Sequence, residues 1–201
     1  NGQHYYGGQG GGVYNWYYGT LTITKSTITG NKAISGGGIN NVGSMEINGG
    51  STVSKNSAFY AGGIYNLAQG TIANSTISGN SANLKTIKNY GYTYFYGGRG
   101  GGVGNFLNGV LTITNSTISG NKAAGKIITR KAYGHTYTYC YGGAGGGILS
   151  VGNLYLYGGK VSGNSATCYG GGIFYYSGGT LVNTSNVTGN KAKVGPNIFY
   201  Y

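Results

Sequence analysis

The chain has 201 residues, of which 45 are glycine and 22 are tyrosine, and only 7% are charged. Thirteen lysines and arginines stand against one acidic residue, which gives a formal net charge of +12. This balance excludes sites built from several carboxylates and favours polyanionic partners. The length fits one domain, residues 1–201, and no apolar run approaches the 18 residues of a membrane span.

Six segments of the chain repeat one pattern, which is most complete in GGGVGNFLNGVLTITNSTISGNKA at Gly100–Ala123. Successive units begin 25 or 26 residues apart, except for two spacings of 39 and 45 residues. A period in this range predicts a solenoid or a propeller. A seventh unit begins at Gly195 and holds one strand. The six longer units begin at Gly10, Gly36, Ala61, Gly100, Gly145 and Gly170.

The residue types within the units predict strands rather than helices. Each unit holds three apolar positions that alternate with Thr, Ser or Gly, which is the period-2 pattern of a strand with one buried face. Because a propeller blade needs four strands and about 40 residues, we predict an all-β, single-stranded parallel β-helix of about six to seven coils. The expected buried columns are Val13, Ile39, Ile64, Val103, Ile148, Ile173 and Ile198; Ile23, Ile47, Ile72, Ile113, Leu156 and Val182; and Ile28, Val53, Ile77, Ile118, Val161 and Val187.

A corner is expected after the third strand, where an asparagine recurs and glycine usually precedes it. Both residues tolerate the left-handed conformation of a sharp bend, and stacked asparagine amides can hydrogen-bond along the axis. An alanine two residues later fits the narrow inside of the bend. The asparagines are Asn31, Asn56, Asn80, Asn121, Asn164 and Asn190.

The phrase GGGIYN, a short gap and then LTITNSTISGN(S/K)A resembles the repeat of bacterial right-handed parallel β-helix proteins. The resemblance covers nearly the whole chain outside two insertions. It implies a right-handed coil and a surface-anchored, autotransporter-passenger-like or sheath-like protein. That scaffold also carries adhesins and polysaccharide lyases, so the motif is specific for fold rather than for function. The chain departs from the family in having Glu46 as its only acidic residue.

The two insertions, at about residues 83–99 and 124–144, explain the long spacings. Both leave the stack after the asparagine corner and carry alternating tyrosines, so each set should lie on one strand face. We expect the insertions to pair with one another as a side wing that serves as a lateral contact or a glycan platform. A truncated third copy is expected around His4. The platform residues are Tyr5, Tyr6, Tyr92, Tyr94, Tyr96, Tyr137, Tyr139 and Tyr141.

Basic residues gather at the corner after the third strand and in the insertions. They predict a basic stripe that attracts acidic polysaccharide, an anionic cell surface or, less favourably, nucleic acid. The alternative is that a chain with almost no acidic residues needs some charge for solubility. The stripe residues are Lys85, Lys88, Lys126, Arg130 and Lys131.

Two features bear on the compartment. Cys140 and Cys168 each precede Tyr-Gly-Gly at the entry to adjacent coils, which lie about 4.8 Å apart, so a disulfide is feasible if a bulge absorbs the difference in the glycine run. Such a bond would indicate an extracellular or cell-surface setting. The first residues carry no signal segment, so we expect a mature secreted product. N-glycosylation sequons are expected on the second and third strands at Asn74, Asn115, Asn183 and Asn186.

Catalytic sites have little support in the sequence. Glycosidase chemistry requires two carboxylates and calcium sites require several, whereas Glu46 stands alone. His4 and His135 have no partner acid, and two cysteines without C-x-x-C spacing give no metal signal. We therefore expect no enzyme activity, no cofactor and no metal, although a lyase with a Lys, Arg, Tyr or His base stays open.

Two hypotheses follow. The first is an extracellular structural subunit that stacks head to tail with copies of itself into a filament or sheath. The second is an adhesin-like module whose basic, tyrosine-rich edge holds acidic polysaccharide or a cell surface. Axial contacts in the first case would involve Gly10, Val13, Tyr14, Ile198, Phe199, Tyr200 and Tyr201.

Overall fold

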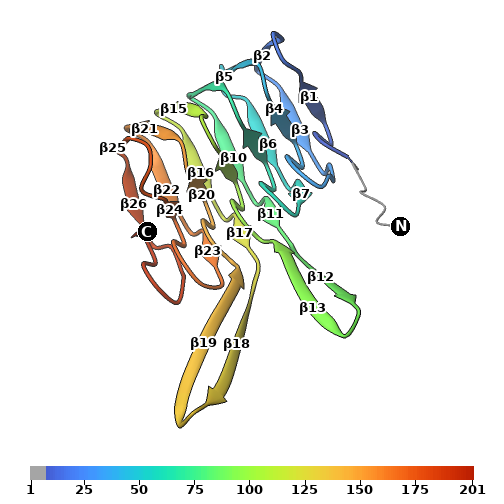
Figure 1. Ribbon diagram of the computed structural model, residues 1–201. Helices are drawn as coiled ribbons and strands as arrows, with labels where there is room; N and C mark the ends of the chain where they lie inside the picture. Colours follow the sequence, from blue (N-terminus) through green and yellow to red (C-terminus); the bar gives the residue numbers. More distant parts are fainter. Residues whose placement is uncertain (1–7) are drawn as a thin grey trace.

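A computed structural model of the chain describes residues 8–201 (Figure 1). These residues form strands, turns and bends and contain no helix. Parallel strands lie one above another in a single stack, from β1 (Val13–Asn15) at one end to β27 (Ile198–Tyr200) at the other. The all-β class is confirmed, and the parallel sheets give a solenoid-like architecture.

Each of the six longer coils supplies one strand to each of three long sheets, as the three apolar columns predict, and the seventh adds β27 to one of them. The seven-stranded sheet contains β1, β4 (Ile39–Asn41), β8 (Ile64–Asn66), β14 (Val103–Asn105), β20 (Ile148–Ser150), β24 (Ile173–Tyr175) and β27. One six-stranded sheet contains β2 (Thr20–Thr24), β5 (Ser44–Asn48), β9 (Gln69–Ala73), β15 (Val110–Thr114), β21 (Asn153–Tyr157) and β25 (Leu181–Asn183). The other contains β3 (Thr27–Thr29), β6 (Thr52–Ser54), β10 (Thr76–Ser78), β16 (Thr117–Ser119), β22 (Lys160–Ser162) and β26 (Asn186–Thr188).

A fourth, short sheet was not predicted. It follows the asparagine corner, where the backbone stays extended for two residues and pairs with the coils above and below. The alanine of each pair points into the stack and is buried, so the predicted packing of the bend is confirmed in these coils. Its strands are β7 (Ser57–Ala58), β11 (Ser81–Ala82), β17 (Lys122–Ala123) and β23 (Ser165–Ala166).

The strand registers confirm the predicted apolar columns in every coil but one. Ile113 pairs with Ile72 and Leu156, and Ile118 pairs with Ile77. Ile113 is 3% exposed and Ile118 is 1% exposed, so both side chains face the interior. Burial of each such side chain contributes about 1.5–3 kcal/mol.

The exception is the sixth coil, where the prediction for Val182 is wrong. Val182 pairs with Tyr155, and Leu181 takes the inward position against Leu154 and packs on the core. The bend between β25 and β26 is one residue shorter than the bend between β21 and β22, as the registers of the two strand pairs show. An alignment that counts back from the third strand assumes equal bends, so it assigns β25 a register that is wrong by one residue. A shift of one residue exchanges the inward and outward faces of a strand.

The asparagine corner forms a hydrogen-bonded ladder, as predicted. Asn121 Nδ2 donates to Asn164 Oδ1 at 2.9 Å and to the Ile77 carbonyl oxygen at 3.0 Å. Asn121 Oδ1 accepts from both the backbone N–H and the Nδ2 of Asn80. Each amide thus satisfies buried groups of the two neighbouring coils, which water does not reach.

A second asparagine ladder, at the end of the first strand, was not predicted. Asn41 Nδ2 donates to Asn66 Oδ1 at 2.7 Å, and Asn66 Nδ2 donates to Asn105 Oδ1 at 2.9 Å. The signal was present in the sequence, because asparagine closes the phrases GGGVYN, GGGINN, AGGIYN and GGGVGN. The fifth coil ends this ladder with Ser150, which accepts from Asn105.

Left-handed residues mark the bends. The glycines before the corner asparagines have φ of 61–74°, and Lys55, which replaces one of them, has φ of 54°. Two predicted sequon residues also lie in bends rather than on strands: Asn74 and Asn115 have φ of 47° and 45°. Asn183 ends β25 and Asn186 begins β26. The glycines are Gly30, Gly79, Gly120, Gly163 and Gly189.

Replacement of Asn121 by alanine should lower the free energy of unfolding by about 3 kcal/mol, because it leaves buried donors and acceptors of two coils without partners. Asn31→Ala is the matched control. Asn31 lies in the first coil, is half-buried and only donates to Asn56, so water can replace it at a cost of about 1 kcal/mol. Urea unfolding of both variants measures the difference. Equal losses would contradict a cooperative internal ladder.

Candidate binding surface

The two insertions form separate antiparallel hairpins. The first consists of β12 (Leu84–Asn89) and β13 (Tyr92–Gly97), and the second of β18 (Gly125–Ala132) and β19 (His135–Gly142). Figure 1 shows both projecting from one side of the stack and diverging from each other. The predicted pairing between insertions is therefore wrong: each strand pairs with its own neighbour in sequence.

Local turn geometry explains this pairing. Tyr90 and Gly91 join the strands of the first hairpin, and Tyr133 and Gly134 join those of the second. All four residues have positive φ, as in the two-residue turns that match the twist of a hairpin. Closing such a short loop costs far less chain entropy than pairing strands from different insertions.

The hairpins place basic residues and tyrosines on the same face. In the second hairpin Lys126 is opposite Tyr141, and Arg130 is opposite Tyr137. Directly opposite residues in an antiparallel pair share a face. Ile128 lies between these pairs, opposite Tyr139. The face therefore alternates cations and apolar groups on one strand and carries tyrosines on the other.

The first hairpin repeats the arrangement in part. Lys85 is opposite Tyr96, while Tyr94 and Tyr92 face Ile87 and Asn89. Two members of the predicted basic stripe lie on the hairpin faces that do not carry the tyrosine rows. Lys88 is opposite Thr93 in the first hairpin, and Lys131 is opposite Thr136 in the second. The sequence predicted the tyrosine faces but not which cations share them, because this pairing depends on the turn positions.

Three contacts fix the hairpin bases. Lys85 Nζ lies 5.6 Å from the centre of the Phe59 ring, which supports a cation–π contact. The Phe95 and Tyr141 rings, one from each hairpin, have centroids 4.8 Å apart. Cys140 of β19 and Cys168 of the stack form a disulfide with a Cα separation of 6.4 Å.

The remaining predicted residues lie elsewhere. Gly10, Val13 and Tyr14 lie at one end of the seven-stranded sheet and Ile198–Tyr201 at the other, so the chain does not bring the two proposed axial contacts together. His4, Tyr5 and Tyr6 fall outside the described residues. The carboxylate of Glu46, on β5, accepts a hydrogen bond from Asn48 Nδ2 at 2.6 Å. Residues 8–201 hold no group of three or more His, Cys, Asp or Glu side chains that could bind a metal.

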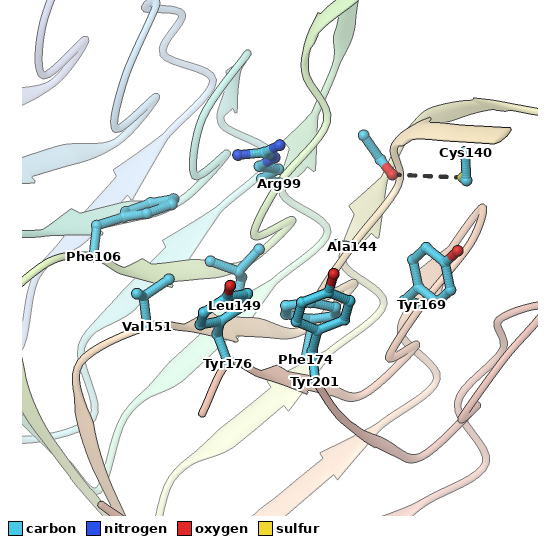
Figure 2. Close-up of a pocket in the computed structure, with 11 residues that line it drawn as sticks. Arg99, Phe106, Cys140, Ala144, Leu149, Val151, Tyr169, Phe174, Tyr176 and Tyr201 are labelled. Carbon is cyan, nitrogen blue, oxygen red and sulfur yellow. Dashed lines mark hydrogen bonds between the residues drawn. The ribbon is translucent and has the colours of Figure 1, made fainter. Parts of the chain in front are cut away.

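A groove on the outer face of the seven-stranded sheet was not predicted (Figure 2). It has a volume of about 440 Å³. Aromatic rings, aliphatic side chains and a single arginine line it, and the base of the second hairpin contributes Cys140 and Gly142. Residues that shape it include Arg99, Phe106, Leu149, Val151, Tyr176 and Tyr201.

Burial affects one tyrosine beside this groove. Tyr65 stacks on Phe106, with ring centroids 4.6 Å apart. Burial raises the pKa of the Tyr65 hydroxyl above its ordinary value of 10.0, and the neighbouring Tyr60 raises it further. Tyr65 is therefore neutral at physiological pH, and the positive charge of the nearby arginine is the charge that a ligand meets in the groove.

Comparisons with protein-family models, with curated proteins and with solved structures find no match. The described part of the chain contains no helix with the length and apolar character to cross a membrane. The surfaces themselves, two cationic aromatic hairpins and an aromatic groove, are thus the basis for a functional argument.

Thiol alkylation tests the disulfide. Alkylating reagent should modify neither Cys140 nor Cys168 in the unreduced protein and both after reduction, as read by mass spectrometry. Reduction should also lower the free energy of unfolding by about 3 kcal/mol, because it frees a loop of 28 residues in the unfolded chain. The stability of the double variant Cys140→Ser/Cys168→Ser should not respond to reductant. Alkylation of both residues without reduction would rule out the bond.

Proposed function

We propose that this protein is a non-enzymatic extracellular module that holds acidic polysaccharide on its two hairpins. The observation that carries the proposal is the shared face of cations and tyrosines, in which Lys126 and Arg130 lie opposite Tyr141 and Tyr137. Tyrosine rings offer large, rigid contact areas to sugar rings, while ammonium and guanidinium groups pair with carboxylates or sulfates.

The spacing of the rings suits a repeating polymer. The ring centroids of Tyr92 and Tyr94 are 6.5 Å apart, and those of Tyr94 and Tyr96 are 6.4 Å apart. In the second hairpin His135 and Tyr137 are separated by 6.4 Å. Equivalent contacts thus recur along β13, so successive sugar units can make the same interaction there and add their binding free energies.

Fold, compartment and chemistry support the same proposal. We take the solenoid-like stack to be a right-handed parallel β-helix, an assignment that rests on the resemblance of its repeat to bacterial surface proteins. The Cys140–Cys168 disulfide is typical of oxidising, extracellular settings. Glu46, the only acidic side chain, lies on β5 and not on the hairpins, so the hairpin faces have no carboxylate for general acid catalysis.

Binding of polygalacturonate by the full chain tests the proposal. The double variant Lys126→Gln/Arg130→Gln should bind at least about tenfold more weakly, a loss of about 1.4 kcal/mol. The matched control is Lys88→Gln/Lys131→Gln, which removes the same charge from the opposite faces and should bind nearly as the parent does. Affinity should fall as salt rises from about 0.05 to 0.5 M, since the Debye length shortens.

Two results would contradict this function. Equal loss of affinity in both double variants would show that net charge, and not the aromatic face, attracts the polymer. Binding that is insensitive to salt, or equally tight to a neutral polysaccharide, would remove the role of the cations. Calorimetric titration distinguishes these cases because it measures affinity and stoichiometry together.

A filament or sheath subunit is a second candidate. The outer edges of β1 and β27 have no strand partner among residues 8–201. Unpaired strand edges are templates for association. Because the two edges differ, a contact between them is heterologous and propagates instead of closing into a dimer.

Electron microscopy of the purified chain tests this candidate. Deletion of Ile198–Tyr201 should abolish filaments and leave a folded stack, because it removes the outermost strand of the seven-stranded sheet. Circular dichroism serves as the control for folding. Filaments that persist unchanged in the deletion variant would eliminate the axial contact.

A further inference from the structure

Aromatic rings stack along the outer face of the seven-stranded sheet, one coil above another. Tyr176 and Tyr201 stack with centroids 5.0 Å apart and an interplanar angle of 23°. Phe174 and Phe199 stack at 5.5 Å and 28°. In both pairs the rings come from adjacent coils, so their faces point along the stack. The ring at each end of such a stack has one face that no other ring of the stack covers.

A second aromatic stack lies further toward β1. Phe106 stacks on Tyr65 at 4.6 Å, with an interplanar angle of 26°. Glycine at position 104 permits this approach, because a Cβ atom there would lie 2.3 Å from Cε2 of Phe106. Tyr65 covers one face of Phe106, which also packs against the cluster of Ala144, Leu149 and Phe174 and lines the groove.

The fifth coil interrupts the two stacks. It places Leu149 in register between Gly104 and Phe174, and Val151 follows in the next outward position, between Phe106 and Tyr176. Neither residue carries a ring. Figure 2 shows these aliphatic side chains between Phe106 and the rings of the sixth coil. The groove therefore lies where the fifth coil has no aromatic side chain between the aromatic side chains of the fourth and sixth coils.

The volume of the groove fits one sugar ring. Phe106 and Tyr176 belong to the fourth and sixth coils, and Leu149 and Val151 of the fifth coil form the floor between them. The volume of about 440 Å³ lies within the range of about 300–1,000 Å³ that is typical of small-molecule sites. A pyranose fits such a site, and its C–H faces pack on aromatic rings.

Arg99 supplies the charge at this gap. It pairs with the small Ala144 of the next coil and is exposed, so its guanidinium is accessible at the groove. The only side-chain carboxylate in the chain, on Glu46, belongs to β5 of a different sheet and is bound by Asn48. A guanidinium binds a carboxylate through two parallel hydrogen bonds, which fixes orientation as well as charge.

We infer that the gap binds one carboxylated pyranose ring, stacked between Phe106 and Tyr176 with its carboxylate on Arg99. This site is distinct from the hairpin faces and rests on the proposed function only for the class of ligand. Its ligand is a single sugar unit, whereas the hairpins contact a polymer through repeated weak interactions.

Methyl NMR of the full chain with glucuronate as the probe tests the site. Glucuronate should shift the methyl resonances of Leu149 and Val151, and glucose should bind at least about tenfold more weakly. Val151→Phe supplies the missing ring and should abolish binding without loss of stability. Its matched control is Val42→Phe, which adds the same ring at the equivalent position of the second coil and should leave glucuronate binding unchanged.

Further variants separate this site from the hairpins. Lys126→Gln/Arg130→Gln should weaken binding of the polymer and retain the glucuronate shifts. Arg99→Gln should remove the preference for glucuronate over glucose, whereas Arg99→Lys should keep part of it. If the hairpin variant loses glucuronate binding too, the groove is not an independent site and the inference fails, while the proposed function stands.

Three other results would overturn the inference. If glucuronate shifts no methyl resonance of Leu149 or Val151, the gap does not bind the sugar. If glucose binds as tightly as glucuronate and Arg99→Gln changes nothing, the carboxylate has no role. If added unlabelled protein produces the shifts instead, an aromatic side chain of a second copy fills the gap.

Discussion

Every coil of this protein is constrained by the identity of the coils beside it. Backbone hydrogen bonds run along the stack in register, so each side chain has a neighbour of the equivalent position about 4.8 Å away. Like charges at that distance repel by about 0.9 kcal/mol even in water. The constraint disfavours columns of like charges, in a chain of which 7% of the residues are charged and all but one of these are basic. The ladder that follows the asparagine corner illustrates it, since its lysines are always separated by serine: Lys32, Ser57, Ser81, Lys122, Ser165 and Lys191.

The same constraint made much of the fold predictable. A column of isoleucines or asparagines in the sequence corresponds to a ladder in space, so the repeat spacing alone gave the register around Ile113 and the hydrogen bonds of Asn121. Prediction failed where the repeat length changed. The shorter bend before β26 shifted Val182, and the Tyr-Gly turns carry a weaker hairpin signal than Asn-Gly, so the separate hairpins were missed.

The candidate sites were harder to predict because they depend on which residues share a face after the bends are formed. The five basic residues of the predicted stripe divide between the two faces of each hairpin because side chains alternate along a strand, and the turn position sets which of these faces carries the tyrosines. The groove depends on a difference between coils: the fifth coil has Val151 where the fourth and sixth coils have Phe106 and Tyr176. A repeat pattern shows what the coils share, whereas the binding specificity proposed here comes from the coil that departs from the pattern.

The disulfide connects the two candidate sites. Cys140 is part of β19, whose outward tyrosines form the hairpin face, and it also lines the groove together with Gly142. Its bond to Cys168 holds the base of the second hairpin against the stack. Exposed hairpins are marginally stable alone, so this covalent link and the Phe95–Tyr141 contact order both the proposed polymer-binding face and one wall of the groove. On the proposed function, an oxidising environment would supply rigidity for recognition at both surfaces, since ordering these strands only on binding would reduce the affinity.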